Sequence, residues 1–228
     1  DAGTQETFEK VRGVKKGFLN IFKNLKKYNT NKNGNIIIKY ILTNENYNKN
    51  EINSFVNLIE DYGLTNCNFE ISTDYKFENL DLEKSFAIIY FYNKLKDTGC
   101  DFVHFDDHVR KRLYNTLINK MEPEEINNNN LFKNLREFFN KEIIVWGTGR
   151  YAEETIQKSF LFKNSKVLFY VDKNFQKKLD HSVKGKIFDP SEIKKYSNPI
   201  FIASSTYWHE IYQQIQDMGI DKNRVINT

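Results

Sequence analysis

The residues with the clearest capacity for chemistry form a glycine-rich loop in the second half of the chain. Residues 147–152 read Gly-Thr-Gly-Arg-Tyr-Ala and directly follow the apolar run 142–146. This G-x-G-x-x-A spacing is typical of a dinucleotide-binding turn between a strand and a helix. Gly147 permits the tight turn, Gly149 lets a pyrophosphate approach the backbone, and Ala152 lets the helix pack closely on the sheet. The start of that helix would then attract phosphate charge.

A carboxylate stands where such a site needs one. Asp172 ends the apolar run 166–171, roughly 20 residues beyond the glycines, where a carboxylate accepts hydrogen bonds from a ribose diol. A hydroxyl-rich turn, 204–206, ends another apolar run at 199–203. The alternative is a glycine loop that binds no ligand and contacts a partner protein.

The surrounding pattern predicts about four strands and three helices, one mononucleotide-binding half of a Rossmann fold. We expect strands at 142–146, 166–171, 186–190, 199–203 and 224–226 (the one at 186–190 a short strand or edge), and helices at 149–160, 191–195 and 207–218.

Two segments, I-x-x-W-G-T-G and V-x-x-x-V-D-K-N, are similar to small Rossmann-like domains of sugar-modifying proteins. Such domains occur in sugar acyltransferases, membrane sugar dehydratases, sugar methyltransferases and other polysaccharide-synthesis enzymes. The resemblance implies a nucleotide sugar or NAD(P) at the loop. By position, phosphates would meet Gly147, Thr148, Gly149 and Arg150, the ribose or base would meet Asp172 and Lys173, and the site would be closed by Ser204, Ser205 and Tyr207.

The first half alternates helices with strands, which is typical of parallel βα units. We expect a helix at 5–28, followed by a strand at 35–42 that is buried on both faces. A helix capped by Asn48 and Glu51 and ended by Gly63 should follow, and then a strand at 68–72. A helix that starts at 82 and ends at Gly99, a strand at 101–105 and a last helix complete this half. Three such strands cannot close a barrel, so this region is expected to be half of a larger structure.

The opening D-A-G-T-x-E-T-F, with the runs 37–46 and 69–74, resembles radical S-adenosylmethionine enzymes over roughly residues 1–120. The resemblance implies the later half of a partial α/β barrel that binds S-adenosylmethionine and an iron–sulfur cluster. The C-x-x-x-C-x-x-C loop that holds the cluster is not in this chain, so we expect the chain alone, a fragment or degenerate member, to be inactive. Remnants of the cofactor site would be Asn46, Ser72 and Thr73; alternatively, Asn46 belongs to an ordinary loop and Ser72 caps a strand.

Other candidate groups favour structural roles. Among His104, Asp106, Asp107 and His108 an aspartate can cap the following helix, which we favour over metal ligation, so no metal site is predicted. The Tyr-x-x-x-Lys spacing of Tyr90 and Lys94 precedes the glycine loop, which disfavours a short-chain dehydrogenase. His181 and His209 are acid–base candidates, although surface histidines are the commoner case.

Composition sets the outer limits. The 228 residues carry 34 Lys and Arg against 30 Asp and Glu, with no concentrated basic stretch, so nucleic acid is not an expected partner. No apolar run reaches about 18 residues, and the two cysteines exclude a disulfide scaffold, so we expect a cytoplasmic protein without a membrane span. The Asn-rich tract 127–130 suggests domains at 1–126 and 142–228 joined by a linker, 127–141.

The sequence therefore predicts nucleotide or nucleotide-sugar binding, within a radical S-adenosylmethionine-like enzyme of sugar or cell-envelope biosynthesis. The alternatives are a stand-alone NAD(P)-dependent oxidoreductase and a non-catalytic assembly module. The pattern is compatible with a homo-oligomer.

Overall fold

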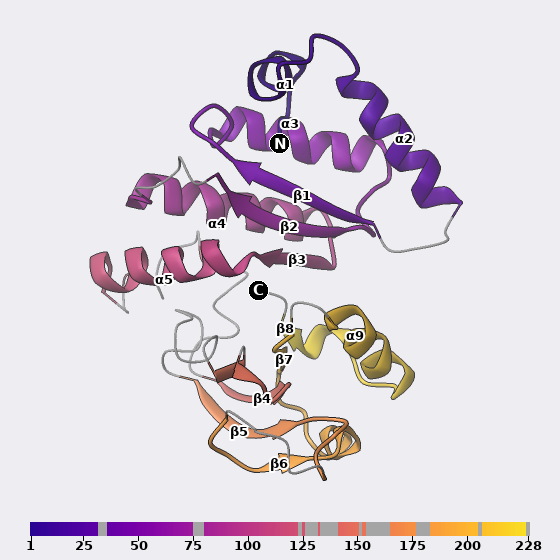
Figure 1. Ribbon diagram of the computed structural model, residues 1–228, viewed down its shortest axis with the longest axis vertical. Coiled ribbons are helices and arrows are strands. Elements are labelled where there is room, and N and C mark those ends of the chain that lie inside the picture. Colours follow the sequence, from indigo (N-terminus) through magenta and orange to yellow (C-terminus); the bar gives the residue numbers. More distant parts are fainter. Residues whose placement is uncertain are drawn as a thin grey trace. The chain divides into compact units, whose positions relative to one another are not determined.

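The chain forms two compact units, residues 1–134 and 135–227. Each contains helices and a parallel sheet, so the predicted α/β class is correct (Figure 1). The boundary falls inside the expected linker 127–141, most of which lies outside the described residues. The computed structural model describes residues 1–31, 36–74, 80–122, 125, 132, 141–150, 152–153, 165–176, 183–204 and 207–226.

In the first unit, three parallel strands lie in the order β1-β2-β3, with their arrowheads at the same end in Figure 1. The elements are α1 (Gln5–Arg12), α2 (Phe18–Thr30), β1 (Ile37–Leu42), α3 (Lys49–Asp61), β2 (Asn68–Thr73), α4 (Leu82–Asp97), β3 (Phe102–Phe105) and α5 (Asp107–Lys120).

The single helix expected at 5–28 is two helices, and two glycines explain the difference. Gly13 ends α1 at a φ of 68°, and its N–H donates to the Glu9 carbonyl at 2.8 Å. Gly17 precedes α2 at a φ of 100°. These left-handed conformations favour glycine and interrupt the helical hydrogen bonds. The apolar spacing continues through the break because apolar side chains of the two helices pack against each other, with the Phe8 and Phe18 rings 5.4 Å apart.

The core of the first unit covers one face of its sheet. The Tyr40 ring on β1 lies 4.6 Å from the Phe55 ring of α3 and 4.7 Å from the Phe91 ring of α4. Strand β1 was expected to be buried on both faces, and this is wrong for the described structure: Ile37 is 51% exposed whereas Tyr40 is 1% exposed. Successive strand residues point to opposite faces, and α3 and α4 pack on the face that carries Tyr40, whereas Ile37 lies on the other face.

The second unit has five parallel strands in the order β6-β5-β4-β7-β8, and the segment 186–190, expected as a short strand or edge, supplies one of them. Strands β4 and β5 match their predicted bounds. The elements are β4 (Glu142–Trp146), β5 (Lys166–Val171), β6 (Ile187–Phe188), the 3-10 helix η3 (Pro190–Lys195), β7 (Ile200–Ile202), α9 (Trp208–Asp217), the 3-10 helix η4 (Lys222–Arg224) and β8 (Val225–Ile226).

Strand β4 is the central strand of this sheet. Ile143, Ile144 and Val145 are fully buried, and β5 and β7 are bonded to its two edges. A strand held on both edges and both faces fixes the position of the loop that follows it. Most of the helix predicted at 149–160 lies outside the described residues. Within the described ranges, no helix combines the length and the apolar character that a bilayer span requires.

Candidate functional site

Gly147 makes the turn out of β4, as the sequence predicted. Its φ is 125°, and its N–H donates to the Val171 carbonyl at 2.9 Å. The Ala203 N–H donates in turn to the Trp146 carbonyl at 2.8 Å. A Cβ at position 147 would lie 2.7 Å from the Ala203 carbonyl oxygen. The backbone angle and the close approach of β7 therefore both require glycine here.

Gly149 has a different environment. The N–H groups of Ala152 and Glu153 donate to its carbonyl at 2.9 and 3.4 Å, which begins a helical turn directly after it. Ala152 is fully buried, as expected for close packing of a helix on the sheet. A Cβ built on Gly149 would meet no described atom within 4 Å, and Gly149 is exposed. Among the described residues, nothing therefore blocks the approach of a ligand to the backbone here.

The side chain of Asp172 faces the glycine loop. The Thr148 hydroxyl, on a side chain only 4% exposed, donates to Asp172 Oδ2 at 3.0 Å. The Asn174 N–H donates to Asp172 Oδ1 at 2.8 Å. An ionised carboxylate accepts about four hydrogen bonds, so these two contacts leave it capacity for more. Thr148 therefore connects the two loops through a buried hydrogen bond and is not exposed at the surface of the site.

Two further predicted site residues, Lys173 and Tyr207, lie close together near the end of β4. The Lys173 ammonium, after β5, lies 6.0 Å from the centroid of the Tyr207 ring, which precedes α9. The Tyr207 N–H donates to Ser204 Oγ at 2.9 Å. Because β4 lies between β5 and β7, this contact places both residues beside the glycine loop. Arg150 is exposed on the same edge, and Ser205 lies outside the described residues.

The predicted remnants in the first unit are bonded within the chain. Asn46 is fully buried; its Oδ1 accepts from the Thr43 N–H at 2.7 Å, and its Nδ2 donates to the carbonyls of Asp1 and Ile41 at 2.7 and 3.0 Å. Ser72 donates to Asp106, and Thr73 accepts from Arg112 Nη1 at 3.2 Å. Their role toward S-adenosylmethionine stays a prediction.

Glu51 connects the opening segment to α3. Its two oxygens accept from the Gly3 N–H at 2.8 Å and from the Thr4 hydroxyl at 2.6 Å. The Asn48 side chain accepts from the Glu51 N–H at 3.0 Å, so the predicted cap is correct, but the Glu51 carboxylate bonds the opening segment. A Cβ on Gly3 would lie 2.0 Å from the Glu51 carbonyl oxygen, so only glycine fits this contact.

A row of titratable side chains that sequence reasoning missed crosses the face of this sheet opposite Tyr40. Lys39, Glu70 and His104 are in register on β1, β2 and β3. Lys39 Nζ lies 2.6 Å from Glu70 Oε1, and His104 Nε2 lies 3.5 Å from Glu70 Oε2. Each is the third residue of its strand, and a polar residue at that point of each apolar run was the signal available.

Glu70 and Lys39 hold each other in their charged forms. A hydrogen bond with His104, opposed by burial and assisted by Lys39, lowers the pKa of Glu70 to about 2. Burial opposes protonation of Lys39, but its hydrogen bond and ion pair with Glu70 raise its pKa. Glu70 therefore remains ionised near neutral pH, where it can accept hydrogen bonds but cannot act as a general acid.

The remaining candidate residues make contacts that support the fold. Asp106 Oδ1 accepts from the Val109 N–H at 2.8 Å, so the predicted cap of α5 is correct. No metal-binding group of three or more ligand side chains occurs among the described residues. Burial raises the pKa of Cys67 to about 11 and that of Cys100 to about 12, so both thiols stay protonated. The His209 ring lies 3.8 Å from the Trp208 ring; His181 is outside the described residues.

Comparison with known proteins adds one match. A family model described as "C2185-like, N-terminal" matches residues 139–226, most of the second unit and less than half of the chain. No curated protein matches the chain. No solved structure matches it either.

The bonds of Asn46 predict a stability effect. Asn46→Ala leaves two carbonyls and one N–H without this side chain as their partner, and should lower the free energy of unfolding by about 1–3 kcal/mol. The exposed neighbour Asn44 provides the control, since Asn44→Ala should change it by less than about 0.5 kcal/mol. Urea unfolding measures both. Equal stabilities of the two variants would contradict a structural role for Asn46.

The pKa of Glu70 predicts a pH effect. Because it is lowered from 4.5 to about 2, the stabilisation from Glu70 is present above pH 4.5 and is lost as pH falls toward 2. Glu70→Gln cannot titrate, so its unfolding free energy should fall less than that of the wild type over this interval. Urea unfolding at several pH values tests this, with the exposed Glu60→Gln as a control that keeps the wild-type slope. Identical slopes for all three proteins would show that the row does not hold the Glu70 charge.

Proposed function

We propose that the second unit binds a nucleotide, most specifically a nucleotide sugar, with its pyrophosphate on the loop 147–150. The observation that carries this is the combination of an open backbone at Gly149 with a carboxylate, Asp172, directed at the same loop. If the loop served only for packing, neighbouring side chains would fill the space beside Gly149. The turn before it also requires glycine at position 147, where the φ of 125° is a backbone angle that favours glycine.

The strand order supports the position of the site. Counted along the chain, the order β6-β5-β4-β7-β8 is third, second, first, fourth, fifth, as in doubly wound dinucleotide-binding sheets. In such sheets, ligands bind outside the carboxyl ends of the strands where the order reverses, here between β4 and β7. Gly147 follows β4 and Ser204 follows β7 at this point. A Rossmann-like fold is therefore the finer assignment that we propose for this unit.

The chemistry of the edge suits the three parts of a nucleotide. N–H groups at the start of the helix, with the exposed Arg150 guanidinium, favour a pyrophosphate. The Asp172 carboxylate accepts hydrogen bonds from a ribose diol. Tyr207 is 57% exposed and offers an aromatic face to a base or sugar ring.

We also propose that the intact protein modifies a sugar or cell-envelope precursor by radical chemistry. The resemblance of the opening segment carries this part, and the first unit is compatible with it. Three parallel strands with helices on one face, and polar side chains on the other, are what the later part of a partial barrel would provide. No step of that chemistry is assigned to residues of this chain.

Calorimetric titration with UDP-N-acetylglucosamine, UDP-glucose, GDP-mannose and NADH tests nucleotide binding. We expect saturable binding of a nucleotide sugar, weakened at least about tenfold by Gly149→Val, because the valine side chain would occupy the space of the pyrophosphate. The fold should tolerate this change, since no described atom lies near that Cβ. Gln213→Val on the exposed side of α9 is the control and should bind as the wild type does.

The outcomes separate the candidate functions. Tight binding of NADH without any nucleotide sugar would replace the proposal by an NAD(P)-dependent oxidoreductase. If no nucleotide binds, or if Gly149→Val binds as well as Gln213→Val, the loop is not the site.

The role of Asp172 is tested by comparison with its partner. Asp172→Ala should weaken nucleotide binding about tenfold to a hundredfold, the value of hydrogen bonds to a charged group. Thr148→Val removes the same loop-to-loop bond but keeps the carboxylate, and should cost clearly less. Dissociation constants from the same titration decide. Equal losses would mean that Asp172 only holds the loop in place.

A further inference from the structure

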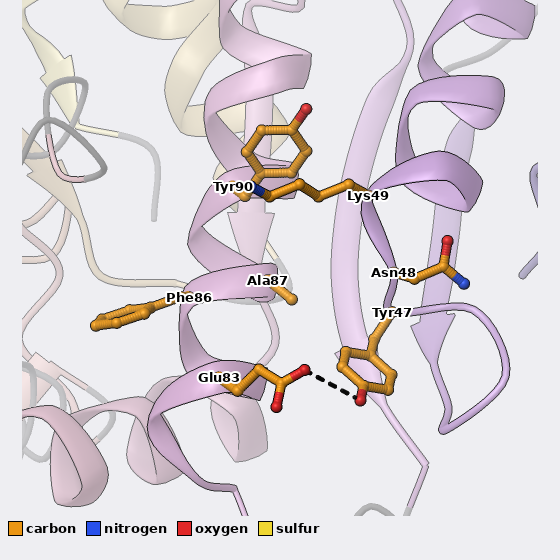
Figure 2. A pocket seen from close by; sticks show the side chains of 7 residues that line it. All are labelled: Tyr47, Asn48, Lys49, Glu83, Phe86, Ala87 and Tyr90. Carbon is orange, nitrogen blue, oxygen red and sulfur yellow. Dashed lines mark hydrogen bonds between the residues drawn. The ribbon is translucent and has the colours of Figure 1, made fainter.

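A hollow lies in the first unit, among residues far from the glycine loop in the chain. It has a volume of about 520 Å³, within the range of small-molecule sites, and lies between the start of α3 and one face of α4. Figure 2 shows Glu83, Ala87 and Tyr90 of α4 facing Tyr47 and the residues that begin α3. The α4 residues recur at helical spacing on one face, and the smallest of them stands between the other two.

Aromatic rings and one small side chain give the hollow its shape. The rings of Tyr47 and Tyr90 lie toward its two ends, with Ala87 between them (Figure 2). Phe86 also lines it, and its ring packs edge-on against Phe132 at 6.4 Å. Alanine at position 87 leaves space that any larger side chain would fill. The wall is therefore suited to the flat apolar side of a ring.

The polar groups of the hollow carry opposite charges at different places. Near one end, the Tyr47 hydroxyl donates to Glu83 Oε1 at 3.4 Å. Near the other, the Lys49 ammonium lies 5.6 Å from the centroid of the Tyr90 ring. Tyr90 itself is held by its hydroxyl, which donates to Asn53 Oδ1 at 2.8 Å. The hollow thus combines an acceptor-only carboxylate with a donor-only ammonium.

These groups restrict the chemistry of a ligand. An anion would be attracted by Lys49 but repelled by Glu83, and a cation would meet the reverse arrangement. A wholly apolar ligand would remove water from both charges without replacing their hydrogen bonds. Neutral hydroxyl groups both donate and accept, so a polyhydroxylated ring can bond Glu83 at one edge and Lys49 at another while an apolar side lies on tyrosine.

We propose that this hollow is a saccharide-binding site that takes a neutral mono- or disaccharide. A nucleobase also has an apolar face, but its polar atoms lie in a single plane at its edge, whereas Glu83 and Lys49 come from different helices at separate places (Figure 2). The site goes beyond the nucleotide site of the second unit and does not depend on it.

Saturation-transfer NMR and calorimetry with the whole chain test the site. The probes are free glucose, galactose, N-acetylglucosamine, maltose and cellobiose, none of which carries a nucleotide, with adenosine and uridine as the competing class. We expect saturable binding of at least one saccharide. We expect no nucleoside to bind in this hollow. Ala87→Leu fills the space and should abolish saccharide binding.

A charge variant keeps the test decisive if Ala87→Leu fails to fold, as judged by circular dichroism. Glu83→Gln should weaken saccharide binding about tenfold through the lost charge-assisted bonds. Asp97→Asn, which changes an exposed carboxylate in the last turn of the same helix, should bind as the wild type does. The proposal would be overturned if no saccharide binds, or if Glu83→Gln binds saccharide as well as the wild type does. It would also be overturned if a nucleoside binds the wild type but not Ala87→Leu. Gly149→Val should leave saccharide binding unchanged, so this site can fail or succeed independently of the nucleotide site.

Discussion

The second unit depends on the fixed position of β4 between two bonded neighbours. Because β5 and β7 hold both edges of this strand, the loops that follow all three strands are brought to one edge of the sheet. The bond from Thr148 to Asp172 joins two of those loops, and the approach of Ala203 to Gly147 joins the third. The candidate site is therefore a consequence of strand pairing, and each of the three loops contributes side chains to it.

The first unit obeys the same geometry with a different result. Its helices bury one face of the sheet around Tyr40, and the opposite face carries Lys39, Glu70 and His104 in register. The charges of Lys39 and Glu70 are stable on that face because the two side chains are paired and partly solvated. The opening segment is fixed separately, by the contact of Gly3 with α3 and the two bonds that Glu51 accepts. The hollow beside Tyr90 lies on the helical side, where Ala87 is too small to fill the space between α3 and α4.

Local signals were sufficient where one residue decides a conformation. Gly63 and Gly99 end their helices with positive φ, and Asn48 and Asp106 cap theirs, as their types predicted. The errors arose where the decision was not local. The helix expected at 5–28 spans a break because apolar side chains of α1 and α2 pack against each other, and β1 reads as fully buried although Ile37 on its second face is exposed.

The sequence by itself determined the alternation of strands and helices, the turn at Gly147 and the presence of Asp172, because these follow from side-chain size, backbone angles and apolar spacing. Tertiary structure decided which residues meet. The 3.0 Å bond between Thr148 and Asp172, the row through Glu70 and the hollow above Ala87 each join residues from separate elements. Such contacts depend on which separate elements pair and pack together, and the apolar spacing within one element does not encode this.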